Sequence, residues 1–284
     1  MPMVTRIAGF LFDMDGVLYR GRRPLPGARA LLADLDRRAV PFALVTNNSA
    51  RTPRQYARHL AAMGMHVPES RIITSSQAAA AYLRRALRPG ARVLVIGEWG
   101  LRQAVRQAGF VVAWDRVAAV VVGLDRTLNF RKLTRATEAL LRGALFVAAN
   151  PDPLIPTEQG VLPGAGVPVE ALAYAVGRRP TVLGKPEPHL LLEGMARIGT
   201  TPPETVMVGD QLSTDIAAGH AAGTLTVHVQ TGVSTTRPAP GNAPRADLVV
   251  RDLRELRRWA AGRLPAAHRL ARLNRATPGL SAVR

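Results

Sequence analysis

The chain contains 284 residues, of which 47% are apolar and 20% are charged. This size fits one large domain or two of ordinary size, and the composition excludes a disordered or collagen-like chain. The sequence contains no cysteine, which excludes disulfides, thiolate zinc sites and cysteine nucleophiles and agrees with a reducing compartment.

The formal net charge is +18, which makes nucleic-acid binding one hypothesis for the function. The basic residues are spread along the whole chain, and among the 38 only Lys132 and Lys185 are lysines. Aromatic residues make up only 5%, which argues against platforms on which bases stack. We therefore expect a basic surface on a protein with another role, and we do not favour nucleic acid as its partner.

Apolar runs such as residues 117–124 are far shorter than the roughly 20 residues that cross a bilayer. The first apolar run, residues 7–12, leads directly into Asp13 and Asp15 instead of a small-residue cleavage site, so it does not resemble a signal peptide. We expect no membrane partner and a cytoplasmic location.

Short β-rich runs alternate with helical stretches along the chain, which predicts an α/β fold with a parallel, helix-covered sheet. In chain order the sequence predicts a strand at residues 7–12, a helix at 26–38, a strand at 41–45, a helix at 53–63, a strand at 72–74, a helix at 77–88, strands at 92–96 and 117–122, a helix at 130–142, a strand at 145–149, a helix at 167–176, a strand at 181–183, a helix at 188–198, a strand at 205–208, a helix at 213–222, strands at 224–229 and 248–249, and a helix at 251–262.

These elements fall into two series. Residues 76–182 have strands and helices of their own, so we predict an inserted second α/β domain within a Rossmann-like parallel-sheet core of residues 1–75 and 183–262. Residues 263–284 are rich in Arg, contain no acidic residue and show weak periodicity, which is typical of a loosely held basic tail.

Two carboxylates follow the first predicted strand, in the segment Asp13-Met14-Asp15-Gly16. Unpaired charge is costly to bury, so these side chains are expected at the carboxyl end of the strand, where open α/β sheets bind ligands. With this spacing Asp13 lies at the end of the strand, and Asp15 lies beyond the turn, where it can reach the other side of a bound group. A solvated turn that only ends the strand is the alternative interpretation.

Two further segments follow apolar runs and can converge on the same sheet edge. Thr46-Asn47-Asn48 supplies a hydroxyl, amides and backbone N–H groups that suit a phosphate, or else an N-cap for the next helix. Asp210 and Asp215 supply two more carboxylates, and Mg²⁺ prefers such oxygen ligands together with a substrate phosphate. The alternative for Asp215 is a helix-start charge that the helix dipole favours.

Lys185 stands in a Gly-Lys-Pro segment of a chain that otherwise uses Arg. A compact ammonium can neutralise a carboxylate and a phosphate oxygen where a planar guanidinium would not fit. The alternative is chance, because Lys132 also stands among arginines, on a predicted helix. We favour a functional role for Lys185 because of the motifs around it.

As a set, these segments resemble the four motifs of the haloacid dehalogenase-like superfamily, in order and over residues 7–250. Any single segment would be a weak signal, whereas the ordered set is specific. The matching residues are Asp13, Asp15 and Gly16 for motif one, Thr46 and Asn47 for motif two, Lys185 for motif three, and Gly209, Asp210 and Asp215 for motif four.

The spacing of the motifs indicates the branch of the superfamily. Asp15 and Thr46 are 31 positions apart, room for one helix and one strand, whereas Thr46 and Lys185 are 139 positions apart, ample for an inserted α/β cap domain. Members with a cap between motifs one and two, such as the sugar-phosphate mutases, are therefore disfavoured. The chain resembles the NagD-like, p-nitrophenylphosphatase branch (class IIA), whose cap lies between motifs two and three. Further similarities are the segments Pro26-Gly27-Ala28, Asn150-Pro151-Asp152 and Pro163-Gly164-Ala165-Gly166.

The resemblance implies a Mg²⁺-dependent phosphatase, a phosphoric monoester hydrolase that acts through an aspartyl-phosphate. Its substrate would be a small phosphorylated metabolite, such as a sugar phosphate, phosphoglycolate, a nucleotide or p-nitrophenyl phosphate. The resemblance implies that Asp13 attacks phosphorus, and that Asp15 protonates the leaving oxygen and later takes a proton from water. A phosphotransferase with the same intermediate and a basic nucleic-acid-binding protein are the alternatives.

The resemblance also implies roles for the remaining site residues. Mg²⁺ would be held by Asp13, the Asp15 backbone carbonyl and Asp210. Asp215 would orient metal-bound water or Lys185. The phosphoryl oxygens would be bound by Thr46, Asn47, Asn48 and Lys185.

Substrate selection is expected in the cap, because the four motifs contact only the phosphoryl group that all phosphomonoesters share. In the family, the loop after the Asn-x-Asp segment reaches the substrate when the cap closes. Here that loop, residues 153–156, is apolar and offers no charge for a second anionic group, so Asp152, Leu154 and Ile155 are the candidate specificity residues. Alternatively, Leu154 and Ile155 pack in the core of the cap itself. Caps of this kind often form dimer contacts in the family, which makes a homodimer through the cap a further expectation.

Overall fold

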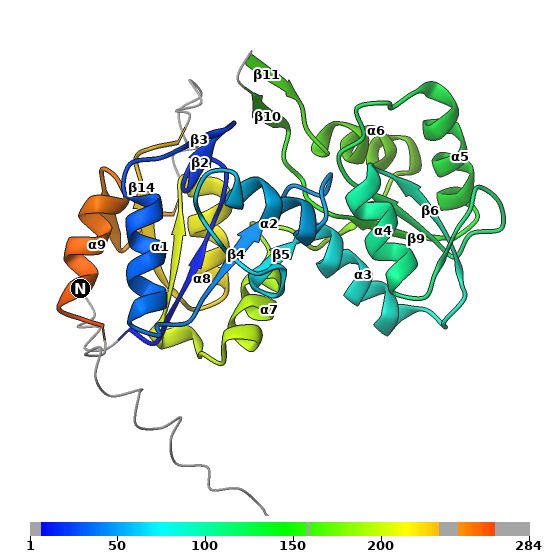
Figure 1. Cartoon of the computed structure of the whole chain (residues 1–284). Coiled ribbons are helices and arrows are strands. Elements are labelled where there is room, and N and C mark those ends of the chain that lie inside the picture. The colour runs from blue at the N-terminus through cyan, green and yellow to red at the C-terminus, as the bar shows by residue number, and fades with distance from the viewer. Residues whose placement is uncertain (1–6, 158–159, 233–243, 265–284) are drawn as a thin grey trace, which may run out of the picture.

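The computed structural model describes residues 7–157, 160–232 and 244–264. Two β-sheets with helices packed on them form two lobes that lie next to each other (Figure 1). The first sheet is six-stranded and the second is five-stranded. This architecture confirms the predicted α/β fold with a Rossmann-like core. Apart from its first two residues, the predicted basic tail lies outside the described residues.

The first sheet is parallel throughout and contains β1 (Gly9–Phe12), β4 (Phe42–Thr46), β5 (Ile72–Thr74), β13 (Thr205–Gly209), β14 (Leu225–Val229) and β15 (Leu248–Val250). Their order across the sheet is β15-β14-β13-β1-β4-β5. The chain adds β4 and β5 on one side of β1, and later adds β13, β14 and β15 on the other side. The winding therefore reverses between β1 and β13, and such a switch point leaves a crevice at the carboxyl ends of the strands.

Successive side chains of each strand face opposite sides of this sheet. Phe10 and Phe12 face one side and Leu11 faces the other, and all three are fully buried. The helices that pack with Phe10 and Phe12 are α1 (Ala28–Arg37), α2 (Pro53–Ala61) and α9 (Leu253–Ala261). The helices that pack with Leu11 are α3 (Ser75–Ala86), α7 (His189–Ile198) and α8 (Ala217–Ala221).

Two helices that follow strands of this sheet begin at capping boxes. The Thr52 hydroxyl accepts a hydrogen bond from the backbone N–H of Gln55, whose side chain accepts one from the backbone N–H of Thr52. Pro53 occupies the first helical position of α2, where its missing N–H costs nothing. Thr74 and Gln77 form the same box at the start of α3. Local sequence therefore fixes both helix starts near the carboxyl ends of β4 and β5.

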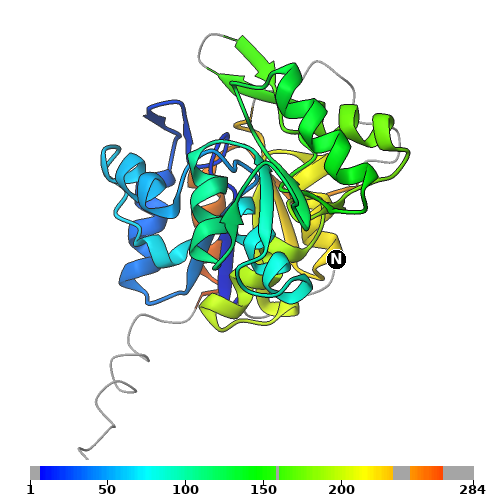
Figure 2. The same cartoon turned by 90° about the vertical axis from the view of Figure 1, so that its right-hand side faces the viewer.

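The second sheet is also parallel and contains, in spatial order, β12 (Thr181–Val182), β9 (Leu145–Ala148), β8 (Ala119–Val122), β6 (Arg92–Ile96) and β7 (Val111–Val112). One side packs against α5 (Phe130–Leu141) and α6 (Gly166–Val176), and the other packs against α4 (Trp99–Gln107) and α3 (Figures 1 and 2). Leu83 of α3 belongs to an apolar cluster with strands of both sheets. The two lobes therefore share part of their core.

Two antiparallel hairpins stand at the edge of the molecule and were not predicted. The first is formed by β2 (Tyr19–Arg20) and β3 (Arg23–Pro24), directly after the Asp13 segment. The second is formed by β10 (Leu154–Thr157) and β11 (Gly160–Pro163). The prediction of a loop at residues 153–156 is thus wrong for all but the first residue, because residues 154–157 pair with residues 160–163 and form a strand.

The remaining differences concern short helices. The helix predicted at residues 213–222 begins as a π-helix, Leu212–Ile216, and continues as α8. Helix α4 was missed because only Gly100, Leu101 and Val105 of it are buried, which is too short an apolar pattern to recognise. Two single turns of 3₁₀-helix, Glu69–Arg71 and Pro202–Glu204, precede β5 and β13. In the described part of the chain, no helix has the length and apolar content needed to cross a membrane.

Candidate active site

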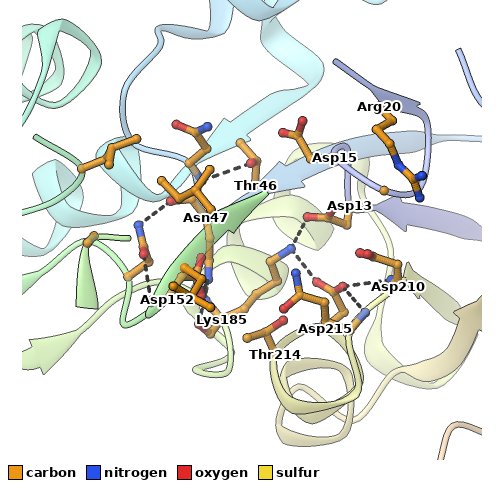
Figure 3. A pocket seen from close by; sticks show the side chains of 18 of the residues that line it. Asp13, Asp15, Arg20, Thr46, Asn47, Asp152, Lys185, Asp210, Thr214 and Asp215 are labelled. Atoms are coloured by element: carbon orange, nitrogen blue, oxygen red, sulfur yellow. Dashed lines mark hydrogen bonds and ion pairs between the residues drawn. The ribbon is translucent and has the colours of Figure 1, made fainter. Parts of the chain in front are cut away.

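The carboxyl ends of the central strands bring residues of all four motifs into one pocket (Figure 3). Asp13 follows β1, Thr46 ends β4, and Asp210 follows β13. Lys185 comes from the segment between β12 and α7, and Asp215 comes from the π-helix. The pocket has a volume of about 200 Å³ and lies at the switch point of the sheet, where α/β proteins bind ligands.

Lys185 forms ion pairs with two carboxylates at the base of this pocket. Its Nζ donates to Oδ1 of Asp13 and, at 2.6 Å, to Oδ1 of Asp215. The Lys185 side chain is only 2% exposed. Burial lowers the pKa of an ammonium group, but the attraction of Asp13 and Asp215 outweighs this and raises the pKa of Lys185 above its ordinary value. Lys185 is therefore a permanent buried cation.

Asp215 is held in place by hydrogen bonds to both of its oxygens. Oδ1 accepts from Lys185, and Oδ2 accepts from the backbone N–H groups of Asp210 at 3.1 Å and Gln211 at 3.0 Å. A Cβ atom on Gly209 would lie 2.1 Å from the Cβ of Asp215, so the close approach of the π-helix to β13 requires glycine at this position. The Gly209-Asp210 and Asp215 spacing seen in the sequence thus has a packing reason.

Asp210 lies in a narrow cradle of backbone. A Cβ atom on Gly16 would lie 2.4 Å, and one on Gly232 2.2 Å, from Oδ2 of Asp210. Its Oδ1 atom is buried and has no hydrogen-bond partner among the described residues. Burial, with repulsion from Asp215, raises the pKa of Asp210 to about 8. A buried, unpartnered carboxylate oxygen of this kind is typical of a cation site.

Three carboxyl groups, those of Asp13, Asp210 and Asp215, lie around the single ammonium group of Lys185. Burial raises the pKa of Asp13 well above its ordinary range; Lys185 opposes this shift, and repulsion from Asp215 and Asp210 adds to it. Asp13, Asp210 and Asp215 each place one oxygen within 4.8 Å of the others. Since both Asp215 oxygens already accept hydrogen bonds, Asp13 and Asp210 are the members available to a cation. Their all-oxygen donor set fits a hard divalent ion.

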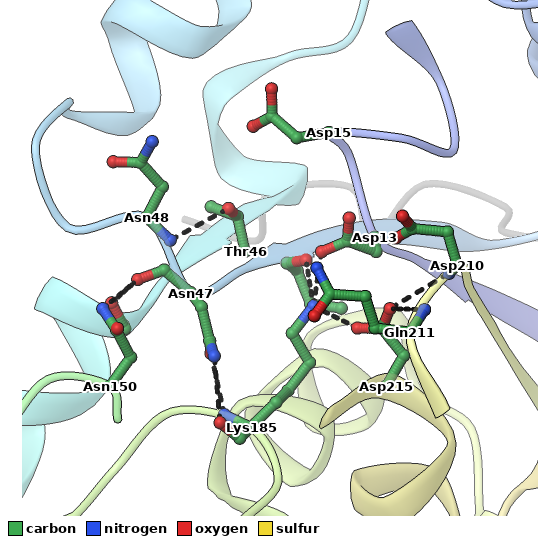
Figure 4. A network of polar contacts seen from close by, with 12 residues as sticks. Asp13, Asp15, Thr46, Asn47, Asn48, Asn150, Lys185, Asp210, Gln211 and Asp215 are labelled. Carbon is green, nitrogen blue, oxygen red and sulfur yellow. Dashed lines mark hydrogen bonds and ion pairs between the residues drawn. The ribbon is translucent and has the colours of Figure 1, made fainter. Parts of the chain in front are cut away.

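Asp15 lies apart from this cluster, across the pocket from Lys185 (Figures 3 and 4). The Tyr19 hydroxyl donates a hydrogen bond to Oδ2 of Asp15 at 3.2 Å. The Asp15 side chain is open to solvent in the pocket but has protein atoms around it, and this enclosure raises its pKa, while the Tyr19 hydrogen bond opposes the shift. A carboxyl group with a raised pKa is suited to giving and taking a proton.

The side chain of Asn47 connects backbone segments and does not point its polar atoms at the pocket centre. Its Oδ1 accepts from the backbone N–H of Lys185 at 2.8 Å, and its Nδ2 donates to the Lys185 carbonyl at 2.9 Å and to Oδ1 of Asp152 at 3.0 Å. Asn48 is also engaged, because its Oδ1 accepts from the backbone N–H of Ala50. Phosphate binding by Asn47 and Asn48 stays a prediction, and these contacts leave the backbone N–H groups of the segment as the candidate donors in place of the Asn47 amide. Thr46 also lines the pocket.

The second lobe contributes the other wall of the pocket. The Asn150 side chain donates to the Asn47 carbonyl at 2.6 Å, which joins the two lobes beside Lys185 (Figure 4). Asp152 is enclosed, and burial raises its pKa to about 6, although the Asn47 hydrogen bond opposes this. Leu154 and Ile155 line the pocket, and Leu154 is 50% exposed. Neither belongs to the apolar core of the second sheet, which the alternative interpretation required.

The glycines of the Pro163–Gly166 segment have a structural cause. A Cβ atom on Gly164 would lie 2.1 Å from the carbonyl oxygen of Asp152, and one on Gly166 would lie 2.4 Å from that of Pro151. The segment therefore closes around the backbone that carries Asp152.

Several residues that line the pocket or contact its carboxylates were not predicted from the sequence. Tyr19 stands four positions after Asp15, a spacing that a search for partners of Asp15 could have found. No local signal marks Gly232, which reaches Asp210 only through the fold. The other lining residues that were not predicted are Arg20, Gly21, Leu124, Gln211 and Thr214.

A parallel sheet with a buried Lys between two carboxylates, a third crowded carboxylate and a fourth across the pocket is typical of a class of enzyme that works on phosphoryl groups. Comparison with known proteins gives the family. Residues 10–111 match the family model described as haloacid dehalogenase-like hydrolase, and residues 182–256 match a second model of HAD-hydrolase-like proteins. The chain belongs to the haloacid dehalogenase-like hydrolases.

Similar proteins indicate the branch of the family to which the chain belongs. It is 39% identical over 226 residues to the 5'-nucleotidase YutF of Bacillus subtilis, a match that covers 80% of this chain and 88% of the relative. The glycerol phosphate phosphatase Rv1692 of Mycobacterium tuberculosis, solved in complex with magnesium, is 38% identical with a TM-score of 0.80, covering 89% of this chain and 77% of that one. NagD of Escherichia coli K-12 is 32% identical with a TM-score of 0.79, covering 88% and 98%. The predicted NagD-like branch is confirmed, and the protein is a phosphatase that acts on small phosphorylated substrates.

We expect the metal-free protein to lose stability as the pH rises from about 5 to about 8. The pKa of Asp210 is about 8 in the folded state against an ordinary value of 3.8. The folded state therefore binds more protons than the unfolded state across this range, so the free energy of unfolding decreases with pH. Asp210→Asn removes this contribution, which amounts to up to about 1.4 kcal/mol per pH unit. Urea unfolding in a chelator at several pH values measures it.

The matched control is Asp36→Asn, because Asp36 is 45% exposed and lies on α1, away from the pocket. It should keep the pH dependence of the wild-type protein. If the free energy of unfolding of Asp210→Asn decreases with rising pH as steeply as that of the wild type, Asp210 does not carry the raised pKa.

Proposed function

We propose that the protein is a Mg²⁺-dependent phosphomonoester hydrolase in which Asp13 is the nucleophile. The observation that supports this most strongly is the ion pair between the buried Lys185 ammonium and Asp13 at the carboxyl end of β1. This ion pair fixes one Asp13 oxygen and leaves the carboxylate at the pocket, where a phosphoryl group can be approached. The proposed substrates are small phosphomonoesters, in keeping with the nucleotidase and glycerol phosphate phosphatase relatives.

The proposed reaction has two steps. In the first, an Asp13 oxygen bonds to phosphorus while the bond between phosphorus and the leaving oxygen breaks, and Asp15 gives its proton to that oxygen. In the second, Asp15 takes a proton from water, the water oxygen bonds to phosphorus, and the bond to Asp13 breaks to release inorganic phosphate. The raised pKa of Asp15 supports the first role, because a protonated carboxyl group must be present when the substrate arrives.

The residues that would hold Mg²⁺ are Asp13 and Asp210, with the Asp15 backbone carbonyl expected from the family resemblance. A bound divalent ion supplies positive charge that stabilises the negative charge of the transferring phosphoryl group. The crowding of Asp13 and Asp210, and the unpartnered Oδ1 of Asp210, support this assignment. Asp215 is a positioning residue, since it holds the Lys185 ammonium and the backbone of Asp210.

The groups proposed to contact the phosphoryl oxygens are the Lys185 ammonium, the Thr46 hydroxyl and backbone N–H groups of the segment that follows β4. Because the amide of Asn47 is engaged by Lys185 and Asp152, its contribution is to hold this segment in position. Residues 76–182 are proposed to act as a cap over the core of residues 1–75 and 183–262. The hydrogen bonds from Asn150 and to Asp152 across the two lobes support this arrangement.

Asp13→Asn tests the nucleophile. We expect turnover of p-nitrophenyl phosphate with Mg²⁺ to fall at least about a thousandfold, because the amide cannot form the covalent intermediate. Asp36→Asn, an exposed carboxylate on α1, should keep wild-type activity. Circular dichroism should show both variants folded. Substantial turnover by pure, folded Asp13→Asn protein would remove the nucleophile assignment.

The metal assignment is tested by binding as well as by activity. We expect a chelator to abolish hydrolysis and Mg²⁺ to restore it. Isothermal titration calorimetry of Asp210→Asn should show Mg²⁺ affinity reduced at least about tenfold, a change of about 1.4 kcal/mol. Asp115→Asn, whose side chain is 62% exposed in the second lobe, is the control and should bind Mg²⁺ as the wild type does. Full activity in chelator, or unchanged affinity of Asp210→Asn, would contradict the assignment.

A further inference from the structure

A second pocket, here called the side pocket, adjoins the active-site pocket and is larger. Its volume is about 480 Å³, against about 200 Å³ for the active-site pocket. Asp15 lines both pockets, so the two are continuous at this side chain. The further residues common to both are Gly21, Asn48, Leu124 and Ile155.

Four parts of the chain form the walls of the side pocket. The hairpin of β2 and β3 contributes Tyr19 and Arg22. The segment before α2 contributes Arg51, and α2 itself contributes Tyr56 and His59. The second lobe closes the pocket with the segment after β8 and with the β10–β11 hairpin. Its lining residues there are Leu124, Arg126, Ile155, Gly160, Val161 and Leu162. The core thus contributes basic side chains, and the second lobe contributes Arg126 and an apolar surface of Leu124, Ile155, Val161 and Leu162.

The basic side chains carry positive charge that the protein does not fully neutralise. Arg126 is paired with Glu98 by two hydrogen bonds, at 2.6 and 2.7 Å. Arg51 is exposed, lies 5.9 Å from the centre of the Tyr56 ring and has no ion pair among the residues that the structure describes. Of the described residues that line the side pocket, Asp15 alone is a carboxylate.

Tyr56 forms the wall of the pocket at the same place. Its side chain is only 1% exposed, and its buried hydroxyl interacts with the Thr46 side chain. His59 is fixed beside it, because its Nε2–H donates to the Gly21 carbonyl at 2.9 Å.

The proposed reaction directs the leaving group of the substrate into the side pocket. Asp15 is the proposed acid, so the leaving oxygen must lie within hydrogen-bond distance of its carboxyl group. The part of the substrate attached to that oxygen then continues past Asp15, away from Lys185, and the side pocket is the space on that side. The inference below therefore rests on the proposed function.

We propose that the side pocket binds the leaving part of the substrate and selects phosphomonoesters that carry a second anionic group, a carboxylate or a phosphate. Arg51, which is exposed and lines the side pocket, forms the ion pair with that group. Ile155, Val161 and Leu162 contact the carbon skeleton between the two anionic groups. The apolar segment 153–156 carries no charge for such a group; the charge comes instead from Arg51, which precedes α2.

The test compares two substrates of similar size that differ at the distal end, 3-phosphoglycerate with its carboxylate and glycerol 3-phosphate with its hydroxymethyl group. We expect kcat/KM of the wild-type enzyme to be higher for 3-phosphoglycerate. In Arg51→Gln the ratio of the two kcat/KM values should fall at least about tenfold, mainly through KM for 3-phosphoglycerate. Arg51→Lys, which keeps the charge, should restore part of the ratio.

The matched control is Arg54→Gln, because Arg54 is exposed on α2 but does not line the side pocket. It should leave both kcat/KM values unchanged, whereas a general effect of lower positive charge would alter its ratio as well. An unchanged ratio in folded Arg51→Gln, or a wild-type preference for glycerol 3-phosphate, would overturn the inference while leaving the proposed function intact. Failure of the wild-type enzyme to hydrolyse any phosphomonoester, p-nitrophenyl phosphate included, would instead overturn the proposed function and the inference with it.

Discussion

The ammonium group of Lys185, buried between Asp13 and Asp215, is the interaction on which the rest of the site depends. Two carboxylates and one cation are buried together here, and removing one partner of such a cluster typically costs about 3–5 kcal/mol. The packing around the cluster serves to hold it. Gly209 lets Asp215 approach β13, and the Asn47 amide fixes the backbone of Lys185 from two sides.

The same cluster explains how four similar side chains come to differ in chemistry. Asp215 has both oxygens engaged and is a structural partner of the cation. Asp210 has an unpartnered oxygen and a pKa raised to about 8, so a divalent cation would stabilise its charged form. Asp13 is paired with Lys185 at the pocket, and Asp15 stands across it, where the Tyr19 hydroxyl donates a hydrogen bond to it. Differences in environment thus separate the proposed nucleophile from the proposed acid, as in other enzymes that use carboxylate pairs.

Local sequence was enough to predict the parts of the fold that depend on short-range patterns. The apolar runs at β1, β4 and β13 and the polar residues that follow them indicated a common sheet edge, because parallel strands place their carboxyl ends together. The paired Thr and Gln residues of the capping boxes also act over a short range, because each pair fixes a helix start through hydrogen bonds between residues three positions apart. The roles assigned to Asp13, Asp15 and Lys185 stay predictions, although the structure places all three in one pocket.

Features that depend on distant contacts could not be predicted in this way. Residues 153–156 have two prolines and no alternating pattern, and residues 154–157 become a strand only by pairing with residues 160–163. The Asn47 amide looked available for phosphate until its contacts with Lys185 and Asp152 were known. The side pocket likewise combines a core helix with a hairpin from the second lobe, so no single segment of the sequence indicates it.

The central claim is that the carboxylate held by Lys185 becomes covalently bonded to phosphorus during turnover. Reductive trapping tests it directly, because borohydride converts an aspartyl-phosphate into homoserine and leaves free aspartate unchanged. The enzyme would be mixed with p-nitrophenyl phosphate and Mg²⁺, quenched with borohydride and analysed by peptide mass spectrometry. The account predicts homoserine at position 13, only when substrate is present. Homoserine at another position, or none while hydrolysis proceeds, would contradict it.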